Sequence, residues 1–153
     1  MKADGFSLLE ILVILLVLSI LAGMVVTRSR KDDFNLATEA EILKAHIRYV
    51  RHLALINDVH SWEIRFEADR YTLFRNGSSA GLSLPQEDSA THLLKAGIEV
   101  DLSTSETGAA VGNLRWDKWG RPVNAADLRL TMTDTLQGQS LDFRILQETG
   151  IIQ

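Results

Sequence analysis

The hydrophobic pattern of the chain begins with a long apolar run near the N-terminus. From Phe6 to Val26, about 21 residues correspond to roughly 31 Å of α-helix. That length matches the roughly 30 Å hydrocarbon core of a bilayer, so the run predicts a membrane-spanning helix. Glu10 is the one charged residue within the run. Because a carboxylate in apolar surroundings is costly unless it is paired, Glu10 is a candidate functional residue.

After the apolar run, the pattern changes to that of an amphipathic helix. Apolar residues recur in alternating steps of four and three, as one face of a helix requires. These residues are Leu36, Ala40, Leu43, Ile47, Val50 and Ala54, flanked by Ile42, Tyr49, Leu53 and Ile56. The polar surface is expected from Glu39, Glu41, Lys44, Arg48 and Arg51. We expect this helix to continue the first one, with a bend near Gly23 or Thr27–Ser29, to stop at Asn57–Asp58, and to pack on a sheet of the same chain.

The rest of the chain alternates apolar and polar residues with the period of two that indicates β-strands. The predicted strands are residues 62–66, 71–74, 98–102, 114–116, 128–132 and 141–145. Turn residues at 68–70 and 137–139 join the first two and the last two strands into hairpins. Residues 76–90 and 103–112 are rich in small and polar side chains and are expected to be loops. One long helix followed by antiparallel strands predicts an α+β fold.

Composition limits the functions that this pattern allows. A chain of 153 residues has room for one membrane helix and one soluble domain. Its net charge of -4 does not favour general binding to nucleic acid. The basic residues of the C-terminal half, Arg115, Lys118, Arg121, Arg129 and Arg144, are interleaved with Asp117, Asp127 and Asp142. The absence of cysteine fits a periplasmic domain that folds without disulfides.

No catalytic constellation is predicted from the sequence, so we expect neither an enzyme nor a cofactor. Among the four histidines, His46 and His52 lie six positions apart and point to different faces of the helix; the others are His60 and His92. No metalloprotease, P-loop, nucleophile-elbow or dinucleotide-binding motif occurs. The acidic residues Asp32, Asp33, Asp101, Glu106, Asp117 and Asp134 are scattered or solvated, so no metal site is expected. Trp116 and Trp119 are expected to cover the rim of a small core, and the alternative is an exposed recognition edge.

The sequence Gly5-Phe6-Ser7-Leu8-Leu9-Glu10, followed directly by the apolar run, resembles the signal of type IV prepilins and type II secretion pseudopilins. The resemblance implies that a prepilin peptidase cleaves between Gly5 and Phe6 and then N-methylates Phe6. It also implies that Glu10 neutralises the N-terminal amine of a neighbouring subunit during filament assembly. Two opposite charges can be buried in a helix bundle as a pair, so this role is physically consistent.

Other N-terminal signals fit the sequence less well. A conventional signal peptide has an apolar region of about 7–15 residues and a cleavage site between small residues. Here the run is longer and carries Glu10, and Met24 stands where a lipoprotein signal needs cysteine. The positive charges of Arg28, Arg30 and Lys31 follow the apolar run, which by charge bias alone places that side in the cytoplasm. The prepilin resemblance implies the reverse orientation, and we give the signal motif more weight.

Downstream, the order of elements, the Gly120-Arg121-Pro122 turn and the Thr149-Gly150 region are similar to the H-type minor pseudopilins, which include FimT-like minor pilins. This resemblance implies a type IV pilin-like fold with a leader at 1–5, a membrane or filament-core half-helix at 6–26, an amphipathic half at 27–58 and a periplasmic β-domain at 59–153.

The implied function is that of a structural minor pseudopilin in the periplasmic filament that helps to export folded proteins. Its implied partners are prepilin peptidase, major and other minor pseudopilins, the inner-membrane assembly platform and the membrane itself, crossed once with the N-terminus in the cytoplasm. Two alternatives remain open. They are a minor pilin of a type IV pilus, for adhesion, motility or DNA uptake, and a signal-anchored periplasmic binding domain.

Overall fold

The computed structural model describes residues 8–57, 59–79, 81–124 and 126–153, and within residues 23–34 it describes the helix but not the side chains. The chain divides into two compact units, Met1–Asn35 and Leu36–Gln153. The first unit contributes the N-terminal part of one long helix, whereas the second has the rest of that helix and all the strands described below. Each unit is described by itself.

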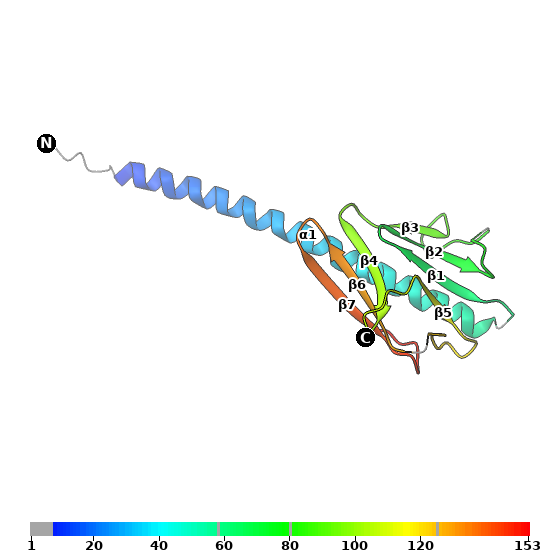
Figure 1. Ribbon diagram of the computed structural model, residues 1–153. Coiled ribbons are helices and arrows are strands. Elements are labelled where there is room, and N and C mark those ends of the chain that lie inside the picture. Colours follow the sequence, from blue (N-terminus) through cyan, green and yellow to red (C-terminus); the bar gives the residue numbers. More distant parts are fainter. Residues whose placement is uncertain (1–7, 58, 80, 125) are drawn as a thin grey trace. The chain divides into compact units, whose positions relative to one another are not determined.

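Helix α1 runs from Leu8 to Ile56, and a final backbone hydrogen bond joins Asn57 N to Leu53 O at 3.1 Å (Figure 1). The predicted end of the amphipathic helix is therefore confirmed. The predicted apolar stripe is confirmed too, because all six of its residues are buried: Leu36, Ala40, Leu43, Ile47, Val50 and Ala54. The expected bend near Gly23 or Thr27 falls where side chains are not described, and it stays a prediction.

One member of the predicted polar surface of α1 was assigned wrongly. Glu41 and Arg48 are exposed, but Glu39 is only 3% exposed. It lies one position before Ala40 of the buried stripe, so its side chain points toward the sheets rather than into solvent. Its partners are described with the candidate site.

The first sheet has four antiparallel strands in the order β3-β2-β1-β5. Their bounds are β1 Trp62–Glu67, β2 Arg70–Arg75, β3 Thr91–Leu93 and β5 Asn113–Trp116. The predicted first hairpin is confirmed by the β1–β2 register, in which Phe66 pairs with Tyr71. Strand β3 was not predicted, because three residues are too few to show a period of two. It places His92 opposite Tyr71.

The second sheet has three antiparallel strands in the order β4-β6-β7. Their bounds are β4 Ile98–Thr104, β6 Leu128–Asp134 and β7 Gln139–Ile145. The predicted second hairpin is confirmed by the β6–β7 register, which pairs Leu130 with Phe143. Because β4 pairs with β6, the strands form two sheets, where the sequence indicated only one antiparallel domain. The alternation of side chains predicts which face of a strand is buried, but not which strand is its neighbour.

The core of the second unit lies between the two sheets and residues 36–56 of α1, which pass behind both sheets in Figure 1. Leu43 and Ile47 of α1, Ile64 and Leu114 of the first sheet, and Leu130 of the second are completely buried. The buried helical stripe thus acts as a common support for both sheets. Trp116 belongs to this core, as expected, whereas Trp119 is 64% exposed.

Candidate functional site

The predicted processing and assembly residues all belong to the first unit. Gly5 and Phe6 lie outside the described residues, so the cleavage and methylation site stays a prediction. Glu10 lies in the first turn of α1 and is exposed. Negative charge is favourable at a helix N-terminus because it faces the positive end of the helix dipole, so the local structure tolerates Glu10.

The helix surface that follows Glu10 is apolar on every side. Its exposed large side chains run without interruption from Ile11 to Leu18 and continue with Ile20 and Leu21. Ser19 is a polar residue within this surface. Its hydroxyl donates a hydrogen bond to Leu15 O at 2.8 Å, so its hydrogen-bonding need is met within the helix. An isolated helix that is hydrophobic all round requires an apolar environment, either lipid or other helices. Among the described residues, no helix meets the length and apolarity that a membrane crossing needs.

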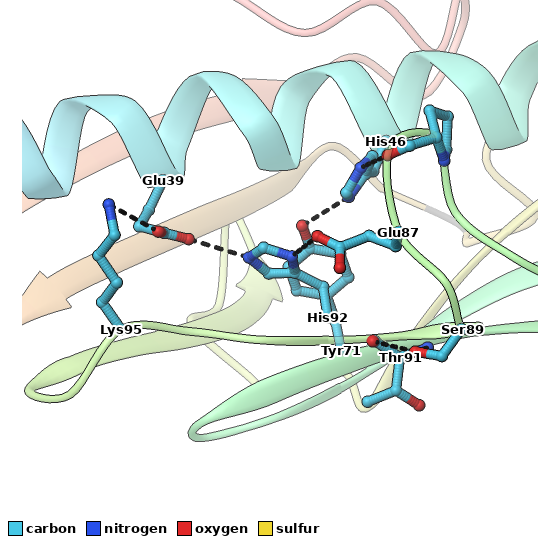
Figure 2. Close-up of polar contacts among 9 residues, drawn as sticks. Glu39, His46, Tyr71, Glu87, Ser89, Thr91, His92 and Lys95 are labelled. Atoms are coloured by element: carbon cyan, nitrogen blue, oxygen red, sulfur yellow. Dashed lines mark hydrogen bonds and ion pairs between the residues drawn. The ribbon is translucent and has the colours of Figure 1, made fainter.

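A second group of polar side chains was not predicted, and it lies inside the second unit. It joins α1 to β2, to β3 and to residues 81–90, which form the last part of the connection between these two strands (Figure 2). Its members are Glu39, His46, Tyr71, Glu87, His92 and Lys95, and we call them the His46–His92 cluster. Glu39, His46, Tyr71 and His92 are all buried.

His92 lies at the centre of this cluster, between two carboxylates. Its Nε2 is 2.9 Å from Glu39 Oε2, and its Nδ1 is 2.5 Å from Glu87 Oε1. The second oxygen of Glu39, Oε1, is 3.2 Å from Lys95 Nζ. The His92 ring also stacks on the Tyr71 ring, with centroids 5.0 Å apart. These contacts place the His92 ring and the Lys95 ammonium on the buried carboxylate of Glu39, and a buried carboxylate is tolerated when it has such partners.

His46 has a different hydrogen-bonding pattern. Its Nε2 is 3.0 Å from the carbonyl oxygen of Pro85, which can only accept, so Nε2 carries the proton. Its Nδ1 is 2.8 Å from the Tyr71 hydroxyl and accepts from it when the ring is neutral. Burial lowers the pKa of His46, and the neighbouring His92 lowers it further, although the Pro85 carbonyl acts in the opposite direction. Burial raises the pKa of Tyr71, so its hydroxyl remains a donor.

The sequence contained a signal for this cluster. Glu39 and His46 are seven positions apart, close to two helical turns, so they lie on the same face of α1. Glu39 also adjoins the buried stripe. The comparison of His46 with His52 was correct, because His46 is buried and His52 is exposed. The prediction compared histidines only with one another, however, and so it missed the carboxylate of Glu39.

Two of the remaining acidic candidates, Asp134 and Asp117, are used within the fold. Asp134 Oδ1 accepts from the backbone N–H groups of Leu136 and Gln137, and Asp117 forms an ion pair with Arg121 at 3.0 Å. The side chains of Asp32 and Asp33 lie outside the described ones. Within the part of the chain that the structure describes, no three His, Asp or Glu side chains are grouped to hold a metal ion.

Comparisons with known proteins find matches both to the N-terminal motif and to the fold. The prokaryotic N-terminal methylation motif matches residues 1–26. Among solved structures, the type IV minor pilin FimU of Pseudomonas aeruginosa is similar in two crystal forms. The first has a TM-score of 0.55 and 19% sequence identity, and the match covers 77% of this chain and 86% of that chain. The second has a TM-score of 0.54 and 18% sequence identity, and the match covers 76% of this chain and 90% of that chain. The chain has a type IV pilin-like fold.

The same fold is found in a second functional class. The minor pseudopilin EpsH from the type II secretion system of Vibrio cholerae matches with a TM-score of 0.53 and 18% identity, over 76% of this chain and 89% of that chain. No curated protein matches the sequence. The predicted resemblance is therefore confirmed for the N-terminal motif and for the pilin-like α+β fold, which minor pilins and H-type pseudopilins share.

Proposed function

We propose that this pilin-like chain is a structural subunit, a minor pseudopilin of a type II secretion pseudopilus. The observation that carries the proposal is Glu10, one carboxylate in the first turn of a helix whose following surface is apolar on every side. In this proposal the precursor crosses the inner membrane once, with its N-terminus in the cytoplasm and its sheets in the periplasm. After cleavage between Gly5 and Phe6, the apolar half of α1 leaves the lipid and packs among the helices of other pseudopilins.

The energetics of this transfer favour a paired Glu10. Burying each large aliphatic side chain stabilises the assembly by about 1.5–3 kcal/mol relative to water, but much less relative to lipid. Packing alone therefore gives little preference for a filament over the membrane. A carboxylate that pairs with the amine of a methylated Phe6 on another subunit stabilises the filament in a way that lipid cannot, because the two charges are then paired in a dry bundle.

A minor pilin of a type IV pilus is the second candidate, and the likeness to FimU favours it. The version of this candidate that binds DNA is less well supported. Arg144 contacts Asp127 at 2.6 Å and Arg121 contacts Asp117 at 3.0 Å, so two of the interleaved basic residues are neutralised. DNA binding needs a continuous basic stripe, because phosphate contacts supply most of the affinity.

The first test is the N-terminal mass of the mature chain, measured in cells with and without a prepilin peptidase. We expect the chain to start at a methylated Phe6 when the peptidase is present and at Met1 when it is absent. An intact Met1 in both cells, or a cut near Gly23, contradicts the proposal.

The second test addresses assembly and uses Glu10→Ala, with Ser19→Ala as the matched control. Both variants remove a polar group from the same apolar segment, but Ser19 bonds only to its own backbone. We expect Glu10→Ala to be inserted and cleaved normally yet lost from sheared filaments. Removing one partner of a buried ion pair costs about 3–5 kcal/mol, which is a loss of more than a hundredfold. Normal assembly of Glu10→Ala would instead support a signal-anchored binding domain.

A further inference from the structure

Residues 81–90 are held against α1 by hydrogen bonds of the two histidines of the His46–His92 cluster. His46 of α1 bonds to the carbonyl of Pro85, and His92 of β3 bonds both to Glu87 in the segment and to Glu39 of α1. Leu84 and Ala90 of the same segment are buried, and Leu82 packs against the core. The hydrogen bonds named above that link the segment to the helix all pass through two titratable rings.

His92 links the segment to α1 through both of its ring nitrogens. Nδ1 faces Glu87 Oε1 of the segment, and Nε2 faces Glu39 Oε2 of α1. Glu39 is buried and also contacts Lys95, so the α1 end of this link lies away from solvent.

The contacts of His46 require its neutral form. Nε2 donates to Pro85, so Nδ1 must be the acceptor for the buried Tyr71 hydroxyl. Protonation of Nδ1 removes that acceptor and adds a positive charge beside the His92 ring, whose centroid is 5.6 Å away. His46 therefore holds Pro85 and Tyr71 together only while its ring is neutral.

We propose that the His46–His92 cluster is a pH-sensitive clasp that holds residues 81–90 against α1 near neutral pH and releases them at acid pH through His46. The groups that face the two rings come from every element around them. They are Glu39 and His46 of α1, Tyr71 of β2, His92 of β3, Lys95 after β3, and Glu87 of the segment itself.

The direction in which the stability of the closed clasp changes at acid pH follows from the burial of His46. Because the pKa of His46 is lowered in the folded chain, the closed clasp favours the neutral ring. The stabilisation is complete above the ordinary value of 6.5 and is lost as the pH falls from there through the lowered pKa. One coupled proton changes the closing equilibrium by at most about tenfold per pH unit.

The clasp can be tested by hydrogen exchange of the full chain in detergent between about pH 4 and pH 9, expressed as protection factors so that intrinsic exchange cancels. We expect peptides of residues 81–90 to be more protected at neutral pH than at acid pH, with up to about a tenfold loss per pH unit as the pH falls. The β6–β7 hairpin serves as an internal reference whose protection does not follow this profile. Equal profiles in both regions overturn the proposal.

Two variants separate a clasp from a merely structural cluster. His46→Gln keeps a donor near Pro85 but cannot become charged, so we expect its loss of protection to move to lower pH. His92→Gln cannot reach Glu39 and Glu87 through two ring nitrogens, so residues 81–90 should be less protected at every pH. If His46→Gln follows the wild-type acid profile, His46 is not the acid trigger.

The ring states can be read directly from nitrogen chemical shifts of the four histidines. We expect the wild type near neutral pH to contain a neutral His46 protonated on Nε2. Its second nitrogen should become protonated over the pH range in which residues 81–90 lose protection. A His46 that is already doubly protonated near neutral pH overturns the proposal.

Discussion

At the scale of single residues, the same residue type has opposite roles at neighbouring positions. Glu41 is exposed and pairs with Lys44 at 2.7 Å, whereas Glu39, two positions earlier, is buried against His92. Trp116 is in the core and Trp119 is in solvent, although only two residues separate them. In each case the direction of the Cβ relative to the buried face decides the role, and residue type alone does not.

Glycines at positive φ give a residue-scale prediction. Gly150 has φ +65, and a Cβ there would lie 2.2 Å from the carbonyl oxygen of Gly120. Gly108 has φ +67 but open space around it. We expect Gly108→Ala to lower the free energy of unfolding by about 1–2 kcal/mol through backbone strain, and Gly150→Ala to lower it by clearly more because the clash adds to the strain. Urea unfolding of both variants measures the difference, and equal losses would show that the Gly120 contact is not needed.

At the scale of elements, α1 changes its environment along its length. Its first part presents apolar side chains on all sides, and its second part buries one stripe under two sheets. One continuous helix therefore combines an exposed apolar surface with a support for a folded domain. The periodicity of the sequence distinguishes the two parts because the first has no polar face and the second does.

Two leucines in the second part of α1 provide a matched pair. Leu43 is fully buried, and Leu55 is 45% exposed. We expect Leu43→Ala to lower the free energy of unfolding by about 2–5 kcal/mol, because the cavity beneath the sheets cannot collapse fully. Leu55→Ala should cost less than half as much, since its side chain is already largely in solvent. Chemical unfolding of the two variants tests this, and similar losses would contradict the described core.

At the scale of the whole molecule, the two units differ in how much buried core they contain. Every residue of the buried core lies between Leu36 and Ile145, within the second unit. The described side chains of the first unit contribute none to that core. The second unit therefore contains its own stabilising interactions, whereas the described side chains of the first unit leave a large apolar surface exposed.

We accordingly expect a chain of residues 36–153 to fold alone. It should be monomeric in solution, show one cooperative thermal transition and keep the protection pattern of its hairpins, because it loses no core side chain. Circular dichroism and size-exclusion chromatography measure this. A non-cooperative transition, with binding of a dye for exposed apolar surface, would show that residues before Leu36 are needed for folding.

The sequence alone determined the features that depend on local periodicity. The buried stripe of α1, the helix end at Ile56 and the two hairpins were all predicted, because a period of 3.6 or 2 records which side of an element is buried. The apolar run with Glu10 and the methylation motif were equally visible, because they are contiguous.

The tertiary structure decided the features that depend on partners far apart in the chain. It paired β4 with β6 and so divided the strands into two sheets, and it added β3, which is too short to have a visible period. It also brought Glu39 to His92 across 53 positions, and so turned a residue of the expected polar surface into a buried ion-pair partner. Such contacts are not encoded in any local pattern, because burial of a charge is decided by whether the fold supplies its partner.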